Sequence, residues 1–228
     1  MSKSTEIIKN YLSQGKKVLT EFESKELLEK IGIPITKQKL TSDKNDTVKF
    51  ADEIGYPVVM KLMADDVVHK SDAGAVKLNI QNKDEIEKSF DELMSIPSKS
   101  EKKINIQKMA DEPITEIIIG MTTDPQFGPA LMFGIGGILV ELLEDVSFRI
   151  APIEKFDANE MIHEIKGFPL LDGFRGKPKA DIDAIIDALL KVSDLVIQNP
   201  EIYEMDLNPI FVYNSGIVCV DARIILKD

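Results

Sequence analysis

Acidic, amide and guanidinium side chains near the C-terminal end of the chain follow a pattern that could hold a metal ion and a phosphate. In the run IYEMDLNPIFV, apolar and polar residues alternate, so a strand there carries Asp206 and Asn208 on one face. The run VCVDARIIL carries Asp221 and Arg223 on one face in the same way. Asn208 and Asp221 offer the hard oxygen ligands that Mg²⁺ takes together with phosphates and waters, and the fork of Arg223 suits a phosphate. Pro209 inside the first run indicates an edge strand or a bulge, where a ligand could approach.

The two runs are joined by Asn214-Ser215-Gly216, which is a tight-turn signal and predicts a hairpin. A two-residue turn at Asn214-Ser215 places Asn208 opposite Asp221 and Asp206 opposite Arg223. A turn centred one residue later keeps these side chains on the same face, whereas a three-residue turn does not. The competing interpretation is a surface strand whose polar side faces water and has no function.

Two further segments carry cations where a nucleotide could bind. Lys61 interrupts the apolar strand pattern VVMKL, either because it contacts phosphate or because its ammonium simply reaches water. His69 lies in VHKSDAGAV, a run of small and polar residues whose backbone amides could cradle phosphate oxygens. A neutral imidazole is a competent nucleophile near neutral pH, although a histidine in a loop is more often incidental. His163, in an amphipathic helix, is interpreted as an ordinary side chain.

A glycine-rich segment, MFGIGGILVE, contains Gly134, Gly136 and Gly137 between two strand patterns. It does not open a helix after a strand, so it is not a dinucleotide-binding fingerprint. Its glycines fit either a bend needed for packing or the close approach of backbone to a ligand.

The composition indicates a globular protein and narrows the possible partners. The 228 residues include 28 Lys and Arg against 39 Asp and Glu, a net charge of -11. This balance disfavours nucleic acid or an anionic membrane surface as the main partner. The single cysteine, Cys219, rules out an internal disulfide and is expected on the same strand face as Asp221. We find no signal-peptide or membrane-span pattern and therefore expect a soluble, cytoplasmic protein.

The hydrophobic periodicity predicts an α+β fold of two lobes with the site in a cleft between them. Thr20 with Glu23 fits a capping box for the second helix, and Asp46 is expected to cap the third. The predicted helices cover 4–14, 21–31, 46–54, 83–95, 157–166 and 180–198. The predicted strands cover 35–40, 57–63, 75–80, 104–109, 114–122, 129–134, 137–144, 146–151, 203–212 and 217–226.

Several motifs in a fixed order make the chain resemble a known family. They are LTEFESKELLEKIGIP, GYPVVMKL, HKSDAGAVKL, FGIGGILVELLEDVSFRIAP and EMDLNPIFV with VDARI, which together span most of the sequence. In these motifs the chain resembles the β subunits of ADP-forming acetyl-CoA synthetase (acetate–CoA ligase, ADP-forming). These are ATP-grasp proteins related to the β subunit of succinyl-CoA synthetase. The resemblance implies an N-terminal helical segment at 1–20, a first ATP-grasp lobe at 21–108 and a second at 109–228.

The resemblance also implies a role for each candidate residue. Asn208 and Asp221 match the Mg²⁺ ligands, and His69 matches the histidine that carries the phosphoryl group. Asp206 is assigned as the partner of His69, and Arg223 as a phosphate clamp. The positions implied for binding ATP or ADP are Lys61 at the phosphates, Gln107, Lys108 and Met109 beside the adenine, Glu116 in the nucleotide pocket, and Gly136 and Gly137 lining the phosphates.

The implied activity is that of an acid–thiol ligase: acyl-CoA + ADP + phosphate ⇌ carboxylic acid + ATP + CoA, through phosphohistidine. A separate CoA-binding α subunit with its own catalytic histidine is expected, in an αβ hetero-oligomer of undetermined copy number. The alternatives are an ATP-grasp carboxylate–amine ligase and a nucleotide-binding subunit without catalysis. The sequence leaves open the preferred acid, ADP against GDP, the physiological direction and how far the His69 loop moves.

Overall fold

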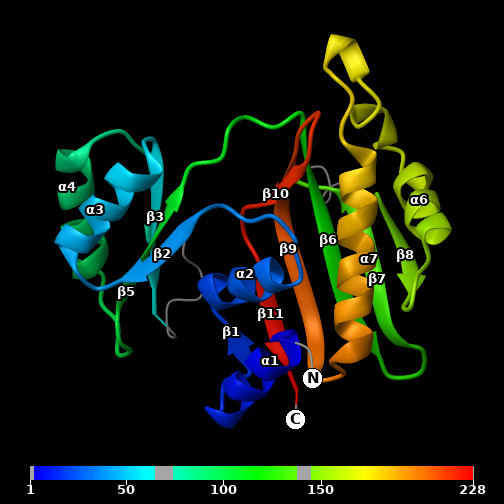
Figure 1. Ribbon diagram of the computed structural model, residues 1–228, viewed down its shortest axis with the longest axis horizontal. Coiled ribbons are helices and arrows are strands. Elements are labelled where there is room, and N and C mark those ends of the chain that lie inside the picture. The colour runs from blue at the N-terminus through cyan, green and yellow to red at the C-terminus, as the bar shows by residue number, and fades with distance from the viewer. Residues whose placement is uncertain (1–2, 65–73, 138–144, 228) are drawn as a thin grey trace. The chain divides into compact units, whose positions relative to one another are not determined.

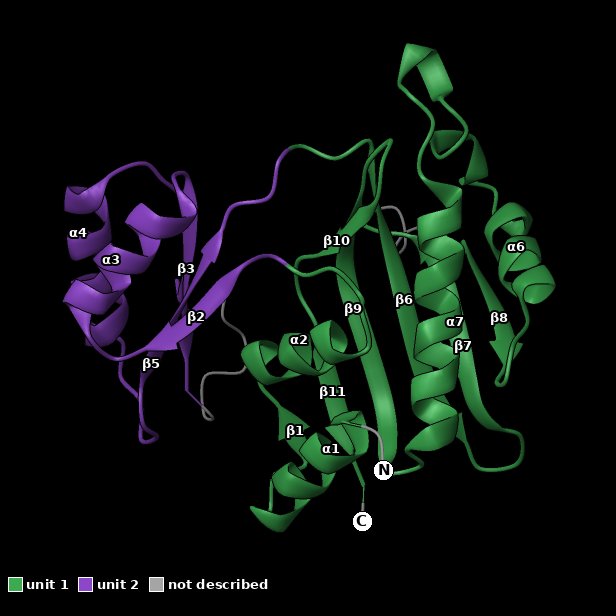
Figure 2. Cartoon of the chain, in the orientation of Figure 1, with its two compact units in different colours: residues 1–35, 112–228 green, residues 36–111 purple. Residues whose placement is uncertain are grey.

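A computed structural model describes residues 3–64, 74–137 and 145–227, which form two compact units (Figures 1 and 2). Unit 1 combines residues 1–35 with 112–228, and unit 2 comprises residues 36–111. Packing therefore groups residues 21–35 with the C-terminal part of the chain, whereas the sequence led us to expect them in the first lobe. The reason is that the N-terminal segment adds a strand to the sheet of unit 1.

Seven strands of the described residues form the sheet of unit 1. They are β1 (Val18–Leu19), β6 (Thr115–Asp124), β7 (Gly128–Ile135), β8 (Val146–Ile150), β9 (Ile202–Val212), β10 (Ile217–Cys219) and β11 (Arg223–Leu226). Their order is β1-β11-β9-β6-β7-β8, with β10 also paired to β9, and each of these pairings is antiparallel. The predicted strand 217–226 is thus two strands, separated at residues 220–222. The predicted strand 137–144 lies almost wholly outside the described residues.

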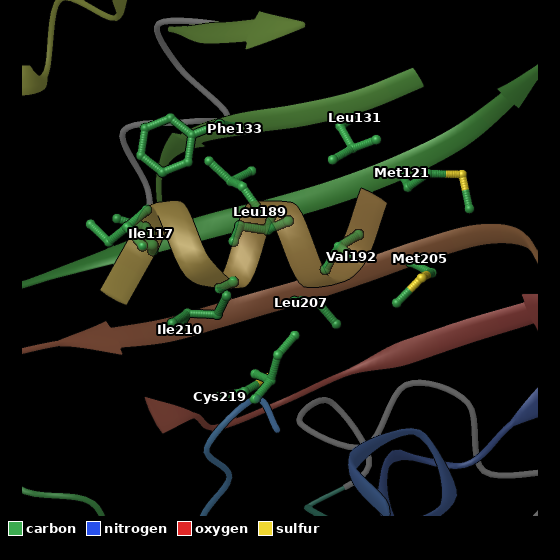
Figure 3. Packing of buried hydrophobic residues seen from close by; sticks show 14 of the residues in the cluster. Ile117, Met121, Leu131, Phe133, Leu189, Val192, Met205, Leu207, Ile210 and Cys219 are labelled. Carbon is green, nitrogen blue, oxygen red and sulfur yellow. The ribbon is translucent and has the colours of Figure 1, made fainter. Parts of the chain in front are cut away.

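One long helix, α7 (Ile182–Gln198), covers the apolar face of this sheet. Its buried residues recur at three- and four-residue spacing, so they form one stripe along the helix. Figure 3 shows Leu189 and Val192 of α7 lying against Phe133 on β7 and Leu207 on β9. The other helices of unit 1 are α1 (Lys3–Ser13), α2 (Glu21–Lys30) and α6 (Lys155–Glu164), with short 3₁₀ turns η1 (Phe168–Leu170) and η2 (Phe174–Gly176).

Unit 2 is a smaller α+β layer with its own core. Its strands, in the order β2-β5-β3-β4, are β2 (Gln38–Thr41), β5 (Lys103–Lys108), β3 (Val58–Met63) and β4 (Val76–Ile80). Its helices are α3 (Lys44–Ile54) and α4 (Lys83–Ser95). Met60 and Leu62 of β3 and Ile104 and Ile106 of β5 pack in one cluster with buried residues of both helices. Every second residue of β3 and β5 therefore points to the face away from the helices.

The N-terminal ends of α2 and α3 show how a side-chain hydrogen bond fixes the residue at which a helix begins. The Thr20 side chain accepts from the Glu23 backbone, and the Glu23 carboxylate accepts from Thr20, so the predicted capping box of α2 is confirmed. The prediction that Asp46 caps α3 is wrong. The capping residue is Asp43, whose carboxylate accepts from the backbone N–H of Asp46 at 2.7 Å. The Asp43 carboxylate reaches that N–H because the helix begins two residues earlier than predicted, at Lys44.

Within the described ranges, the structure contains no helix that is both long enough and apolar enough to cross a membrane.

Candidate functional site

The predicted register of the C-terminal hairpin is confirmed. Tyr213 N–H donates to Gly216 O at 3.1 Å, which closes a two-residue turn. Arg223 lies opposite Asp206, as expected. Further along, Asn208 N–H donates to Asp221 O at 3.2 Å, so these two residues are direct neighbours across the strands. The hairpin therefore brings together the amide, the carboxylates and the guanidinium that the alternation pointed to.

Asn208 and Pro209 form a bulge on β9, which is an interior strand rather than an edge. Ile117 of β6 pairs with Ile210, and Ile119 pairs with Leu207, so two residues of β9 face one residue of β6. A bulge bends its strand and redirects the local side chains, and bulges are frequent beside active sites. Asn208 thus occupies a position where the regular alternation of the strand is interrupted, and its side chain is exposed.

The polar face of the hairpin differs from the prediction at one residue. Cys219 is fully buried, and Figure 3 shows it among the apolar side chains with Ile210 and Leu207. It does not share the exposed side with Arg223, because the chain leaves regular pairing between β10 and β11 and the alternation restarts there. Asp221 lies in this break between the two strands.

The carboxylates of the hairpin lie close enough to influence one another. Burial raises the pKa of Asp206 above its usual value, and the negative charges of Asp221 and Glu204 raise it further. The guanidinium of Arg223 acts in the opposite direction and lowers that pKa. The four side chains therefore share one electrostatic environment, which is net negative and would favour a bound cation.

The donor set of this environment fits Mg²⁺. Asp221 and Asn208 are neighbours and supply a carboxylate and an amide oxygen, and Mg²⁺ needs only one or two protein ligands of this kind when phosphates and waters complete its shell. Across the described part of the chain, no group of three or more His, Cys, Asp or Glu residues is arranged to hold a metal.

Glu116 and the two site glycines also lie together in unit 1. Gly136 N–H donates to Glu116 O at 2.7 Å. A Cβ atom at Gly136 would approach the carbonyl carbon and Cβ of Glu116 to 3.2 Å, so glycine permits the close approach of the two backbones. At Gly137 φ is +74°, a left-handed conformation, and a Cβ there would lie 3.6 Å from Glu116 Oε2. The turn at Gly136-Gly137 thus lies beside the Glu116 carboxylate.

Unit 2 carries the second group of candidate residues, on the face of its sheet away from α3 and α4. Lys61 of β3 lies opposite Asn105 of β5, and Val59 lies opposite Gln107. Lys61 is only 7% exposed, and Gln107 only 2%. Gln107 Oε1 accepts from Thr36 Oγ1 at 3.0 Å. Lys61 and Gln107 therefore lie on the same face of this sheet, and both are buried.

Asn105 is a residue of this face of the sheet that the sequence reasoning missed. It is fully buried, and its Nδ2 donates to Gln38 Oε1 at 3.1 Å. The signal was present, because in the strand KINIQK the residues Asn105 and Gln107 alternate with the buried Ile104 and Ile106.

Lys108 and Met109, predicted to border the adenine, make structural contacts within unit 2. The ammonium of Lys108 donates to Gly55 O at 3.1 Å and to Tyr56 O at 2.8 Å, at the C-terminal end of α3. Met109 N–H donates to Pro57 O at 3.2 Å. These bonds fix the segment that follows β5, so the Lys108 ammonium serves the fold of its own unit.

Of the two histidines, only His163 lies among the residues that the structure describes. His69, the predicted phosphoryl carrier, lies outside the described residues. His163 of α6 has its Nδ1 within 2.8 Å of Asn159 O and its ring 4.1 Å from that of Phe168. It belongs to the packing of α6, in agreement with the sequence interpretation of an ordinary side chain.

Comparisons with known proteins show the family of the chain. The model of the ATP-grasp domain family matches residues 10–226. The chain is 49% identical to the β subunit of acetate–CoA ligase [ADP-forming] II of Pyrococcus furiosus, over 97% of each chain. It is 46% identical to acetate–CoA ligase [ADP-forming] I of Archaeoglobus fulgidus, covering 99% of this chain but 33% of that longer protein.

A solved structure is also closely similar. Acetyl-coenzyme A synthetase 1 of Candidatus Korarchaeum cryptofilum is 44% identical with a TM-score of 0.89, and the match covers 99% of this chain and 100% of that chain. That structure contains coenzyme A and Mg-AMPPCP, and its phosphohistidine segment is described as pointing towards the nucleotide-binding site. The present chain belongs to the ATP-grasp family and, within it, to the ADP-forming acetate–CoA ligases.

Proposed function

We propose that this chain is the nucleotide-binding β subunit of an ADP-forming acyl-CoA synthetase, which interconverts acyl-CoA, ADP and phosphate with a carboxylic acid, ATP and CoA. The observation that carries the proposal is the end-to-end match with a relative named as the β subunit of such an enzyme. The hairpin supports it, because Asn208, Asp221 and Arg223 suit a metal-bound polyphosphate. A cytoplasmic location is part of the proposal and can be checked by fractionation of cells.

In this proposal the described residues neutralise and position the phosphates. Phosphoryl transfer depends mainly on alignment and on charge stabilisation. Asn208 and Asp221 would hold Mg²⁺, which supplies positive charge at the polyphosphate when bound. Lys61, nearly buried on the sheet of unit 2, and Arg223 would add cationic contacts to phosphate oxygens.

The proposal assigns the remaining nucleotide contacts to residues of each unit. The turn at Gly136-Gly137, which lies beside the Glu116 carboxylate, would let backbone amides approach the phosphates. Gln107 and the backbone of Lys108 and Met109 would border the adenine, since the Lys108 ammonium is already engaged with Gly55 and Tyr56.

His69 would carry the phosphoryl group between the partner subunit and ADP. In the direction of ATP formation, an oxygen of the β-phosphate of ADP attacks the phosphorus, the P–N bond to the imidazole breaks, and the ring nitrogen regains its electron pair. Asp206 would orient the imidazole by accepting its other N–H. Burial raises the pKa of this carboxyl group, so it ionises less readily than an ordinary aspartate.

A CoA-binding α subunit is the expected partner. The Archaeoglobus fulgidus relative joins a region like this one to further sequence, since the present chain covers 33% of it. The Pyrococcus furiosus relative is instead named as a separate β subunit and matches over its own length. We therefore propose that this chain works with an α subunit that binds CoA and contributes its own histidine.

The test is to co-express the chain with its α subunit and to compare wild type with His69→Asn. ATP formation from acyl-CoA, ADP and phosphate should fall by about 1,000-fold or more, because the covalent route is lost, while ADP binding is retained. Wild type should also acquire an acid-labile, base-stable phosphate at His69. Normal turnover in the variant would contradict the phosphohistidine route. Wild type that acquires no phosphate at His69 and consumes ATP only when a carboxylic acid and an amine are both supplied would favour a carboxylate–amine ligase. ADP binding without phosphorylation or turnover in wild type would favour a non-catalytic subunit.

A further inference from the structure

A buried lysine of α2 binds the segment that carries Asp221. The side chain of Lys25 is 0% exposed, and its Nζ donates to Val220 O at 3.1 Å. Glu21, one helical turn earlier, places Oε1 3.7 Å from the same ammonium and is itself 2% exposed. The two side chains thus form a buried pair next to the break between β10 and β11.

A lysine in this position needs a reason, because moving an ammonium out of water is costly unless it is compensated. The Glu21 carboxylate supplies the opposite charge, and the Val220 carbonyl supplies an acceptor. An apolar residue could fill the same space in α2 without this cost. What the lysine adds over an apolar residue is a fixed donor to one particular carbonyl.

That carbonyl belongs to the peptide plane that leads into Asp221. The orientation of the plane sets the backbone φ of Asp221 and thereby the direction of its Cα–Cβ bond. The other side of the segment is already held by β9: Val220 N–H donates to Pro209 O at 3.0 Å, and Asn208 N–H donates to Asp221 O at 3.2 Å. The bond from Lys25 supplies a constraint from outside the hairpin, so the segment is held from two directions.

We propose that Lys25 is a positioning residue, which fixes the peptide plane before Asp221 and so aims the Asp221 carboxylate at the metal. The inference rests on the proposed function, in which Asp221 is a Mg²⁺ ligand. Groups that orient a metal ligand typically change metal affinity by about 10- to 100-fold when they are removed.

The test replaces the pair by neutral side chains of similar size, Glu21→Gln with Lys25→Met, in the complete αβ complex. Replacing both members avoids leaving an uncompensated carboxylate in the interior. Mn²⁺ is used as the probe, and its affinity for the ADP-bound complex is measured by electron paramagnetic resonance. We expect it to weaken by about 10-fold, while the affinity for ADP without metal stays unchanged.

Lys191→Met is the matched control. Lys191 Nζ donates to Gly32 O at 2.7 Å, just after the C-terminal end of α2, and pairs with Asp187. This variant therefore removes another lysine-to-carbonyl bond near the same helix without touching the hairpin, and its Mn²⁺ affinity should equal that of wild type. If it loses as much affinity as the pair variant, or if the pair variant loses none, the positioning role is wrong.

Asp221→Asn separates this inference from the function on which it rests. Unchanged Mn²⁺ affinity in Asp221→Asn would refute the metal site itself. Weakened affinity in Asp221→Asn, but not in the pair variant, would refute only the role of Lys25. In the Asp221→Asn background the pair substitution should add nothing, whereas additive losses would show that Lys25 acts elsewhere. Should the pair variant fail to fold, Lys25→Arg keeps a charged donor and is expected to retain Mn²⁺ binding, and a 10-fold loss there would refute the inference.

Discussion

At the scale of single residues, Asp206 is a carboxyl group of the candidate metal site whose ionisation is made unfavourable by its surroundings. Burial and the neighbouring carboxylates Asp221 and Glu204 raise its pKa, and Arg223 compensates only in part. The native state therefore binds a proton at Asp206 more tightly than the unfolded chain does. Functional sites often keep such unfavourable groups at the expense of stability.

We expect Asp206→Asn to stabilise the metal-free protein near neutral pH. Below the usual aspartate pKa of about 3.9, both states carry the proton and no penalty exists. As the pH rises through the raised pKa of Asp206, the native state must ionise against its neighbours and stability falls. The variant lacks this penalty, so its thermal midpoint should be higher than that of wild type at neutral pH.

Thermal melts across the acidic range measure this effect. The advantage of Asp206→Asn should shrink on acidification and vanish below about pH 4. A variant that is less stable than wild type at neutral pH would show that Arg223 outweighs the two carboxylates.

At the scale of elements, the hairpin shows which features can be predicted from the sequence. Its register was predictable because a tight turn and strict alternation are local signals, and they place Arg223 opposite Asp206. The burial of Cys219 was not predicted, because strict alternation was assumed along the whole return strand, although Pro209, which indicates a bulge, lies opposite the break at Val220. The role of Lys25 was equally hidden, because its acceptor, the carbonyl of Val220, lies 195 positions along the chain.

The capping box of α2 provides a prediction at this scale. Thr20→Ala removes the side chain that accepts from the Glu23 N–H, which typically costs about 1 kcal/mol and should lower the thermal midpoint by about 2–4 °C. Glu23→Gln is the control, because glutamine also completes a capping box. Equal melting of Thr20→Ala and wild type would show that the packing of α2 alone holds the helix end.

At the scale of the whole molecule, the chain builds two separate hydrophobic cores. One gathers residues of unit 1 such as Leu189 and Phe133, and the other gathers residues of unit 2 such as Ile106 and Met60. The α+β class was predictable, since helix and strand patterns alternate throughout, and the resemblance of the motifs to a known family implied the ATP-grasp fold. The grouping of 1–35 with 112–228 was not predictable, because it depends on the pairing of β1 with β11 between distant parts of the chain.

The separate cores predict separable unfolding. Ile106→Ala should destabilise unit 2 by about 2–5 kcal/mol and increase amide hydrogen exchange in β3 and β5, while β6 and β9 stay protected. Leu189→Ala should have the converse effect on unit 1. Hydrogen exchange followed by mass spectrometry distinguishes the unfolding of unit 1 from that of unit 2. Uniformly faster exchange in both variants would show that the units unfold as one.

The pairing of β1 with β11 also bears on how the protein is made. As the chain leaves the ribosome, residues 36–111 can close on themselves early, because all four strands of that sheet lie within this stretch. Strand β1 emerges long before β11, the strand with which it pairs, because Leu19 lies opposite Ile224. Synthesis must therefore leave the segment around Leu19 unpaired until Ile224 has emerged, and an apolar strand left unpaired for so long is a site where chaperones can bind.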